Sequence, residues 1–397
     1  MQICFFSDDK AANFYPLTLT RPVDDLRIGI FTIKQKWEYA LQAENISRIV
    51  PKYLEGIFPK GDISGNKDCY WINSRYLPSQ SLIKQIQNLE EDSFLTFDSD
   101  IVAAKIGGKQ SREFFQQDEI KTEGLNKTTT STAKNIQYLW DLISLNSSEI
   151  EYDIPQSKLI PLVEYADKYN FVAQKTHNIF VSKDVIIEPG CTFIAEKGPI
   201  VIQSGATIEA GSILRGPVAV CEQATVKMAS RIYGGTTIGP VCKVGGEVSG
   251  CIFHSYTNKA HDGFTGSSLF GQWVNLGANT ITSNLKNDYS SIKIVDWSTE
   301  IPIDTTLQFF GTVMADHSKT AINTMLNTGT LCGVSSNIFI DELSPKRIPS
   351  FSWVGSKNFE LYRFEKALEV MQAMMKRRSI KLSKEYHEMM KYIFENR

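Results

Sequence analysis

An aliphatic residue recurs at every sixth position through part of the second half of this 397-residue chain. Eight successive positions with this spacing are all Ile, Leu or Val: Ile202, Ile208, Leu214, Val220, Val226, Ile232, Ile238 and Val244. A period of six fits neither an amphipathic helix nor an alternating strand. It predicts a solenoid whose six-residue sides each point one aliphatic residue inward. Such coils bury their aliphatic residues only by stacking on one another.

The repeat extends less regularly in both directions. A weaker run precedes it at Val181, Ile187 and Phe193. After a slip of two residues, the period resumes at Ile252, Asn258, Phe264, Phe270, Leu276 and Thr282. A poorer run follows at Phe310, Asp316, Ile322, Thr328, Val334 and Ile340. We therefore expect the pattern to change around residues 165–180 and the solenoid to span residues 176–345.

Segments typical of strands and helices alternate before the solenoid. "QICFF", "YWINSRYL" and "SFLTFDSDIVAAKI" predict strands, whereas "FTIKQKWEYAL" and "SQSLIKQIQNL" predict helices. This alternation predicts a three-layer α/β domain over residues 1–175.

The chain after the solenoid, residues 346–397, predicts a tail of helices. Apolar residues there lie at helical spacing and would share one face: Leu361, Phe364, Leu368, Met371 and Met375. We interpret the methionines on this face as packing residues rather than a binding groove. The basic run 376–378 is interpreted as a solvated helix face.

Composition excludes several classes of function. The formal net charge of −2 argues against a nucleic-acid or anionic-membrane partner. No segment approaches the ~20 apolar residues of a membrane span, and the N-terminus does not resemble a signal peptide. The 7 cysteines are scattered without a CxxC pair, which predicts reduced thiols and no metal site. We expect a cytoplasmic protein.

The segment "NKAHDGFTGSSLFGQWVNLGANTITSN", residues 258–284, contains His261, one of 5 histidines in the chain. Histidine has a pKa near neutrality and is therefore suited to act as a general base. The alternative is a solvated residue at a turn of the solenoid. Asn275 and Asn284 lie in the same segment, where asparagine is also favoured simply as a turn residue.

The repeat and this segment together resemble the hexapeptide-repeat acyltransferases, and in particular the acetyltransferase domain of the GlmU family of bifunctional uridyltransferase/acetyltransferases. "NKAH" is similar to the family's KAGH motif, and "NLGANTITSN" to its NIGAGT-IT-CN stretch. The resemblance implies a left-handed parallel β-helix, a homotrimer and acetyl-CoA as acyl donor. It further implies that His261 is the base, that Asn275 and Asn284 line the sugar site, and that the Ala278 backbone lies beside the thioester.

A sugar phosphate would also need cationic partners. Arg231 and Lys243 are the candidates in the solenoid. The family has tyrosines where this chain has Phe264 and Leu285. Two acceptor hydroxyls are therefore missing, so the acceptor either is bound differently or is not glucosamine 1-phosphate.

The segment "NFYPLTLTRPVDDL", residues 13–26, loosely resembles the start of sugar-nucleotide pyrophosphorylases. Those enzymes cradle phosphates with a glycine-rich loop after the first strand. The first glycine of this chain is Gly29, so we expect a degenerate domain that needs Mg²⁺ only if it is active. Candidate phosphate or metal contacts, each with a surface role as the alternative, are Lys10, Arg21, Asp98 and Asp100.

The sequence thus favours an acyl-CoA-dependent transferase acting on an amino or hydroxyl group of a sugar phosphate or nucleotide sugar. Two alternatives stay open. One is nucleotidyl transfer by the N-terminal domain, alone or alongside acylation. The other is a trimeric scaffold or regulator without catalysis.

Overall fold

The computed structural model describes residues 1–63, 65, 67–162, 171–355 and 359–397. Residues 163–170, within the stretch where the repeat was expected to begin, lie outside the described residues. The chain forms two compact units. The first unit comprises Met1–Phe14, Arg21–Leu26 and Phe31–Leu139, and the second comprises Tyr15–Thr20, Arg27–Ile30 and Trp140–Arg397.

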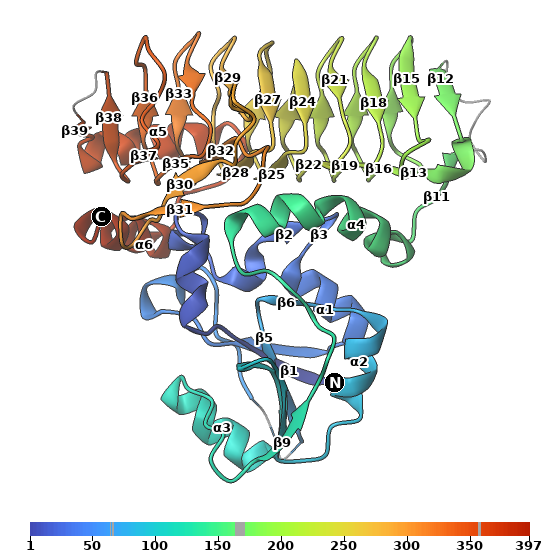
Figure 1. Ribbon diagram of the computed structural model, residues 1–397, viewed down its shortest axis with the longest axis vertical. Helices are drawn as coiled ribbons and strands as arrows, with labels where there is room; N and C mark the ends of the chain where they lie inside the picture. The colour runs from blue at the N-terminus through green and yellow to red at the C-terminus, as the bar shows by residue number, and fades with distance from the viewer. Residues whose placement is uncertain (64, 66, 163–170, 356–358) are drawn as a thin grey trace. The chain divides into compact units, whose positions relative to one another are not determined.

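The first unit contains a six-stranded sheet in the order β4-β1-β5-β8-β7-β9. Strands β1, β5 and β9 of this sheet are labelled in Figure 1. Strands β1, β4 and β5 run parallel to one another, whereas β8 is antiparallel to both β5 and β7. The strands are β1 (Gln2–Phe6), β4 (Asn45–Arg48), β5 (Cys69–Asn73), β7 (Ser93–Phe97), β8 (Asp100–Ile106) and β9 (Asn126–Thr129). All five residues of β1 are buried, as expected for a central strand. The strands expected in this region are confirmed.

Three helices belong to the first unit: α1 (Ile33–Leu41), α2 (Gln80–Gln87) and α3 (Gly108–Gln117). Helix α1 begins where Thr32 and Gln35 form a reciprocal capping box, which satisfies backbone N–H groups of the first turn. Helices α1 and α2 were expected, and α3 was not. Shorter elements of this unit are the strands β3 (Phe31–Thr32), β6 (Tyr76–Leu77) and β10 (Lys134–Asn135), and the 3₁₀ turns Asp9–Phe14, Val23–Asp25 and Lys52–Leu54. Strand β2 (Arg27–Ile28) and the 3₁₀ turn Leu17–Leu19 belong to the second unit.

The second unit is built on a parallel β-solenoid with three sheets. Its first sheet contains β11 (Ile160–Pro161), β13 (Ile179–Val181), β16 (Ile200–Ile202), β19 (Val218–Val220), β22 (Thr236–Ile238), β25 (Ile252–Ser255), β28 (Leu269–Gln272), β32 (Thr312–Met314), β35 (Thr330–Cys332) and β37 (Arg347–Ile348). Strands β13 to β37 of this sheet are all parallel, and only β11 runs the other way.

The second sheet contains β12 (Phe171–Gln174), β15 (Cys191–Ile194), β18 (Ile213–Arg215), β21 (Arg231–Ile232), β24 (Glu247–Ser249) and β27 (Phe264–Gly266). The third contains β14 (Ile186–Ile187), β17 (Thr207–Ile208), β20 (Thr225–Val226), β23 (Lys243–Val244) and β26 (Asn258–Lys259), and continues as β33 (Lys319–Thr320), β36 (Asn337–Ile338), β38 (Ser352–Val354) and β39 (Glu360–Leu361). Each coil visits the second, first and third sheets in turn.

The six-residue period is confirmed from residue 202 to residue 244, since all eight aliphatic residues belong to one buried core cluster. The earlier residues Val181, Ile187 and Phe193 belong to the same cluster. In-register pairing stacks these side chains from coil to coil, as in the ladder Ile202, Val220, Ile238. The core is therefore a set of continuous aliphatic ladders inside the solenoid.

The expected positions directly after Val244 are wrong by one residue. The residues aligned with the core ladders are Phe253, Lys259 and Thr265, instead of Ile252, Asn258 and Phe264. In a parallel pair, the partner of an inward-pointing residue also points inward. Val248 pairs with Ile232 and Phe253 with Ile238, so the inward residues Val244, Val248 and Phe253 are fewer than six positions apart. The expected period is confirmed again at the buried residues 270, 276 and 282.

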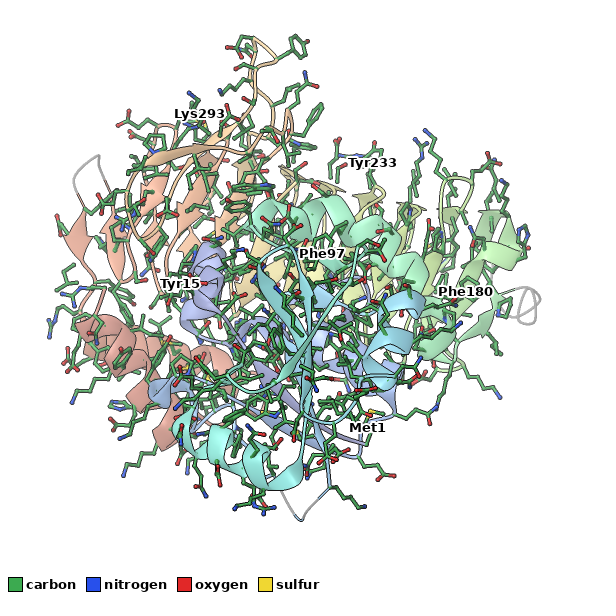
Figure 2. All side chains as sticks on the ribbon, turned by 60° about the horizontal axis from the view of Figure 1, so that its bottom comes forward. Met1, Tyr15, Phe97, Phe180, Tyr233 and Lys293 are labelled. Atoms are coloured by element: carbon green, nitrogen blue, oxygen red, sulfur yellow. The ribbon has the colours of Figure 1, made fainter. Side chains whose placement is uncertain are left out.

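The last expected run is mostly out of register. Ile322 is 70% exposed, whereas the other five members of the run are buried and Ile340 belongs to the core cluster. The buried residues paired across the coils there are nevertheless Met314, Thr320, Leu326, Cys332 and Ile338, two residues earlier than expected. An insertion between β29 (Ile281–Thr282) and β32 shifts the phase, and β34 (Met325–Leu326) pairs back onto β29. The insertion contains the hairpin β30 (Lys293–Val295) and β31 (Pro302–Asp304), whose Lys293 is labelled in Figure 2. Strands β37 and β38 carry the solenoid beyond residue 345 to Val354.

Helix α4 (Leu139–Ser157), which the sequence did not predict, belongs to the same compact unit as the solenoid from Trp140 onward. The buried Asn146 accepts a hydrogen bond from the Gly29 backbone N–H at 2.7 Å and donates to the Gly235 carbonyl at 2.8 Å. Gly29 has a φ of +70°, and a Cβ there would lie 2.6 Å from the Glu149 carbonyl oxygen. The first glycine of the chain is therefore required by packing against α4.

The C-terminal helices are α5 (Phe364–Lys376) and α6 (Lys384–Glu395). Met371 and Met375 are buried, which confirms packing as the role of these methionines. Leu361 instead lies in β39 and is exposed, so its expected place on the helix face is wrong. Helix α6 contacts the solenoid through Tyr386, whose hydroxyl lies 2.8 Å from His317 Nε2.

We predict that Asn146→Ala lowers the free energy of unfolding by ~2–3 kcal/mol, because it leaves buried backbone groups without partners. Denaturant unfolding followed by fluorescence measures the effect. Ser148→Ala, at an exposed position of the same helix, is the control and should change stability by less than ~0.5 kcal/mol. Equal effects of the two substitutions would contradict a specific role for Asn146.

Candidate functional site

His261 lies at the corner where the chain leaves β26 of the third sheet and enters β27 of the second. The residue is exposed, and its imidazole makes no hydrogen bond to any other described residue. The following turn stacks on the next coil, because the Asn279 backbone N–H donates to the Asp262 carbonyl at 3.0 Å. The corner therefore presents a solvent-accessible imidazole next to the turn that contains Ala278.

Lys259, two residues earlier, points into the solenoid and is 2% exposed. It pairs in register with Val244 and so occupies a place where other coils have an aliphatic residue. Its Nζ donates to the carbonyls of Gly245 and His261, both at 2.9 Å. Burial lowers the pKa of Lys259 to about 8. An interior ammonium thus holds the backbone of His261 in place.

Gly246 supports the same corner from the preceding coil. Its φ is +76°, and a Cβ there would lie 3.0 Å from the His261 carbonyl oxygen and from the Asp262 Cα. Few residues other than glycine adopt this backbone conformation readily. The close approach of the two turns therefore depends on glycine at this position.

Four outward residues of the third sheet form a row across neighbouring coils: Lys243, Asn258, Asn275 and Lys319. Asn258 Nδ2 donates to Asn275 Oδ1 at 2.9 Å, which joins the middle two. The row forms part of a pocket of about 400 Å³ that helix α5 also lines. Two residues predicted from the sequence, Lys243 and Asn275, are therefore brought together.

Two of the pocket residues are aromatic. The rings of Tyr256 and Trp273 stack with centroids 4.4 Å apart. The His317 ring stacks with Trp273 at 6.0 Å and meets Tyr386 of α6 edge-on. This column of rings connects the pocket wall to the C-terminal helices.

The other predicted residues do not line this pocket. Arg231 lies on the outer face of the second sheet, where it forms an exposed ion pair with Glu247 at 3.5 Å. Asn284 donates to Ser267 Oγ at 3.3 Å. Ala278 lies in the turn after Asn275, and its carbonyl accepts from the Asn323 N–H at 2.9 Å. The candidates thus occupy two faces, with His261 at the corner between the second and third sheets.

Sequence reasoning missed Lys319, Arg377 and Arg378 as pocket residues. Lys319 is far from Asn275 in sequence, because the insertion with the β30–β31 hairpin separates two adjacent coils. Arg377 and Arg378 were expected on a solvated helix face. Only the packing of α5 shows that they line the pocket.

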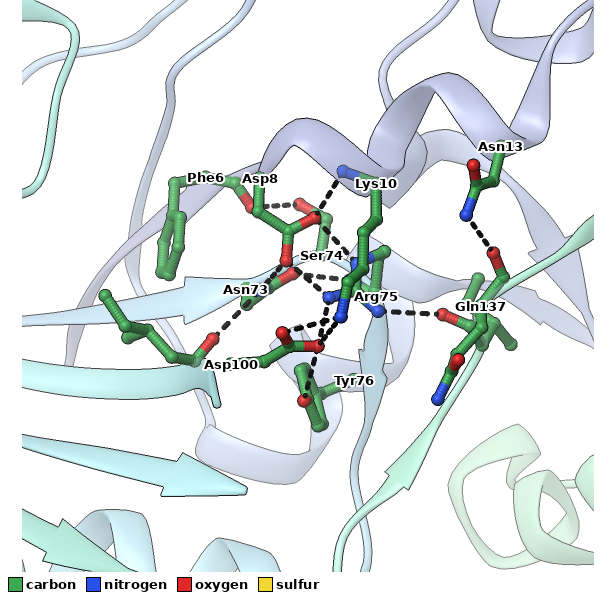
Figure 3. A network of polar contacts seen from close by, with 12 residues as sticks. Phe6, Asp8, Lys10, Asn13, Asn73, Ser74, Arg75, Tyr76, Asp100 and Gln137 are labelled. Atoms are coloured by element: carbon green, nitrogen blue, oxygen red, sulfur yellow. Dashed lines mark hydrogen bonds and ion pairs between the residues drawn. The ribbon is translucent and has the colours of Figure 1, made fainter. Parts of the chain in front are cut away.

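The first unit contains a charged network at the carboxyl ends of the parallel strands β1 and β5, shown in Figure 3. Arg75, which is fully buried, donates from Nε to Asp8 at 2.7 Å and from Nη2 to Asp100 at 2.7 Å. Lys10 also binds Asp100, at 2.7 Å. Burial raises the pKa of Asp100, but the hydrogen bonds from Lys10 and Arg75 outweigh it and lower the pKa overall. Two cations therefore neutralise two carboxylates.

This network bears on the candidates named from the sequence. Lys10 and Asp100 bind each other, and Arg21 is buried with an ion pair to Asp25 at 3.0 Å. Asp98 lies in the turn between β7 and β8 with a φ of +52°. Within the described residues, no group of three or more His, Cys, Asp or Glu side chains is arranged to hold a metal ion.

No helix in the described part of the chain combines the length and hydropathy that a membrane crossing requires. All seven cysteines are buried and free of disulfides. Burial raises the pKa of several of these thiols to about 12, for example those of Cys221, Cys242 and Cys332. Such thiols are poor nucleophiles, because the thiolate is the reactive form.

Comparison with known proteins gives partial matches. Residues 3–158 match the family model described as sugar nucleotidyl transferase. The bifunctional protein GlmU of Methanococcus vannielii is 30% identical over 143 residues, which are 36% of this chain and 32% of that protein. GlmU of Synechococcus elongatus is 27% identical over 212 residues, 49% of this chain and 42% of that protein. The chain thus spans less than half of the length of these curated relatives.

Among solved structures, AntD, an N-acyltransferase from Bacillus cereus, was determined in complex with dTDP and 3-hydroxybutyryl-CoA. It is 12% identical, covers 56% of this chain and 98% of its own, and gives a TM-score of 0.21. A score this low supports no structural conclusion. The chain therefore combines a sugar nucleotidyl transferase-like N-terminal domain, similarity to GlmU over part of its length, and a β-solenoid consistent with a hexapeptide-repeat acyltransferase.

We predict that the contribution of Lys259 to the free energy of unfolding grows as the pH increases from about 8 toward 10.5, the ordinary pKa of lysine, whereas the buried thiols with raised pKa contribute in the opposite direction in the upper part of this window. In that window the folded state releases the Lys259 proton while the unfolded state still binds it, so deprotonation favours folding by ~1–3 kcal/mol. Lys259→Met should lack this contribution, so the difference in stability between wild type and the variant should change by that amount across the window, while the effects of Lys319 and the thiols stay the same in both proteins. The exposed Lys293→Met is the control and should keep the contribution of Lys259. Denaturant midpoints measured at several pH values provide the test, and identical profiles for both variants would contradict the assignment to Lys259.

Proposed function

We propose that this chain is an acyl-CoA-dependent transferase, with acetyl-CoA as donor, that acts on an amino or hydroxyl group of a sugar phosphate or nucleotide sugar. The observation that carries the proposal is the His261 corner. An exposed imidazole there lies next to the Ala278 turn of the following coil, and Lys259 fixes its backbone from inside. The similarity to GlmU proteins over part of the chain supports the same function.

The proposed chemistry needs a base and an oxyanion donor. The neutral imidazole of His261 takes a proton from the acceptor nitrogen or oxygen as that atom attacks the thioester carbonyl. The Ala278 backbone N–H makes no hydrogen bond within the described part of the chain, so it is available to stabilise the tetrahedral oxyanion. Collapse of the intermediate breaks the carbon–sulfur bond, and His261 returns the proton to the departing thiolate.

We further propose that the active assembly is a homotrimer. Asn275 and Lys243 lie on the third sheet, whereas Arg231 and Asn284 lie toward the second, so one chain does not gather all the candidates in one pocket. A neighbouring subunit would complete the site at the His261 corner, and cyclic closure is a common arrangement for identical subunits. Ile213, exposed on β18 beside Arg231, offers apolar surface for such a contact.

We expect that His261→Ala lowers kcat by ~10²–10⁴-fold, because loss of a general base acts on the barrier. Binding of acetyl-CoA should stay within about twofold of wild type, because the base acts on the barrier rather than on donor affinity. Turnover with acetyl-CoA and a panel of amino sugar phosphates gives the measurement. His387→Ala, on α6, serves as the control. Unchanged turnover of His261→Ala with any acceptor that wild type uses would exclude His261 as the base.

The trimer is tested by the mass in solution. Light scattering of the full chain at micromolar concentration should give three times the 44.7 kDa mass of one chain. A monomeric mass under conditions where the protein is active would rule out a site shared between subunits.

Sugar-nucleotide formation is a second candidate, because residues 3–158 match the sugar nucleotidyl transferase model. The first unit offers little support for catalysis. Nucleotidyl transfer depends on positioning phosphates and Mg²⁺. Asp8, which follows β1, and Asp100, the first residue of the antiparallel β8, lie at the edge where the parallel strands β1 and β5 end and where α/β proteins bind ligands, but both are already paired with Arg75 or Lys10. We therefore propose that this domain does not make sugar nucleotides.

We predict no release of pyrophosphate when the protein is incubated with UTP, N-acetylglucosamine 1-phosphate and Mg²⁺. The reason is the absence of glycine before residue 29, which leaves no run of backbone N–H groups accessible to a triphosphate. A coupled pyrophosphate assay provides the test. Mg²⁺-dependent release that is lost in Arg21→Ala would show that the domain is active.

A further inference from the structure

The charged side chains that line the pocket between the third sheet and helix α5 are all positive. Its lining includes Lys243 and Lys319 from the solenoid and Arg377 and Arg378 from the end of α5. Among the described residues, no Asp or Glu lines it. Two separate elements of the fold therefore contribute cations to a single volume of about 400 Å³.

Three of these cations, Lys319, Arg377 and Arg378, have no ion-pair partner among the described residues, whereas Glu209 offsets part of the charge of Lys243. Lys319 Nζ donates only to the His317 carbonyl, at 2.6 Å, and desolvation lowers the pKa of Lys319 to about 8. Desolvation also lowers the pKa of Lys243, and the nearby charge of Arg378 adds to the effect. Like charges held this close are unfavourable unless an anion joins them.

The rest of the lining suits a ligand that is only partly charged. Asn258 uses its amide nitrogen on Asn275 Oδ1, which leaves the Asn275 amide nitrogen free to donate to a ligand oxygen. Val370 and Met374 of α5 add apolar surface, and the Tyr256–Trp273 stack adds an aromatic wall. The pocket thus offers cations, an amide donor and apolar contacts together.

We propose that this pocket binds the phosphate group of a phosphorylated ligand between Arg377 and Arg378, which directly follow α5, and the lysine and asparagine row of the third sheet. Guanidinium groups suit this task, because their planar forks match phosphate oxygens. The inference rests on the proposed function only for the choice of probes, since both a sugar phosphate and coenzyme A carry phosphate. The pocket makes α5 part of the binding site rather than a solvated tail.

The test is calorimetric titration of the full chain with four probes: glucosamine 1-phosphate, UDP-N-acetylglucosamine, coenzyme A and inorganic pyrophosphate. Glucosamine 1-phosphate carries a phosphomonoester, and UDP-N-acetylglucosamine carries a diphosphate diester. Coenzyme A tests binding of the acyl carrier, and pyrophosphate tests binding of a phosphate anion without any organic group. We expect at least one probe to bind at low salt. Its affinity should fall as salt increases, and also above pH 8 as Lys319 loses its proton.

Matched variants locate the site. The double variant Arg377→Gln/Arg378→Gln should weaken binding by at least ~10-fold, as expected for the loss of charge-assisted hydrogen bonds. Arg377→Lys/Arg378→Lys should restore part of the affinity. The control Lys376→Gln/Lys381→Gln removes the same charge from the same segment outside this pocket and should change affinity by less than about twofold.

Two outcomes would overturn the inference. One is that none of the four probes binds wild type at low salt. The other is that the glutamine variant at 377 and 378 binds as wild type does. The proposed transferase activity is tested independently of the phosphate site. Probe binding that depends on these arginines would support the phosphate site even if no acyl transfer were detected. The absence of acyl transfer would contradict only the catalytic role proposed for His261.

Discussion

The in-register stacking of parallel coils is the constraint on which the rest of this molecule depends. Backbone hydrogen bonds between coils fix which residues pair, and pairing fixes which side chains point inward. The interior then admits one side chain from each coil at each ladder position. The outward-pointing residues do not have to fit into this interior. This freedom is what allows a row such as Lys243, Asn258, Asn275 and Lys319 to form along one face.

The sequence was informative where the coils are uniform. Eight aliphatic residues at a fixed spacing predicted the solenoid, and all eight are buried in its core. The prediction lost register after Val244, because alignment between coils is a property of hydrogen-bonded partners and not of a constant spacing. Shorter sides placed Phe253 and Lys259 inward, and a hairpin insertion then displaced the later run. A fixed period cannot represent either change.

In the candidate site too, the sequence identified some residues and missed others. The local motif named His261 and Asn275, because both lie in one continuous segment, residues 258–284. It could not locate Lys319 or Arg378, which reach the pocket through an insertion and through the packing of α5. Helix α4 and its contact with Gly29 were missed for a related reason. Contacts between segments distant in the sequence leave little trace in the composition of either segment.

Lys259 makes its coil different from the coils before Val244, where the inward residues at the repeat positions are all aliphatic. At the six-residue spacing before Val244 the inward residues are all Ile, Leu or Val, so these ladders alone would tolerate the duplication or deletion of a whole coil. The coil of Lys259 has no such freedom, because its ammonium is satisfied by the carbonyls of Gly245 and His261 specifically. The aliphatic ladders therefore leave the number of coils before residue 244 open, apart from the coil whose Gly235 binds Asn146, while the coil beside the histidine corner is fixed by Lys259.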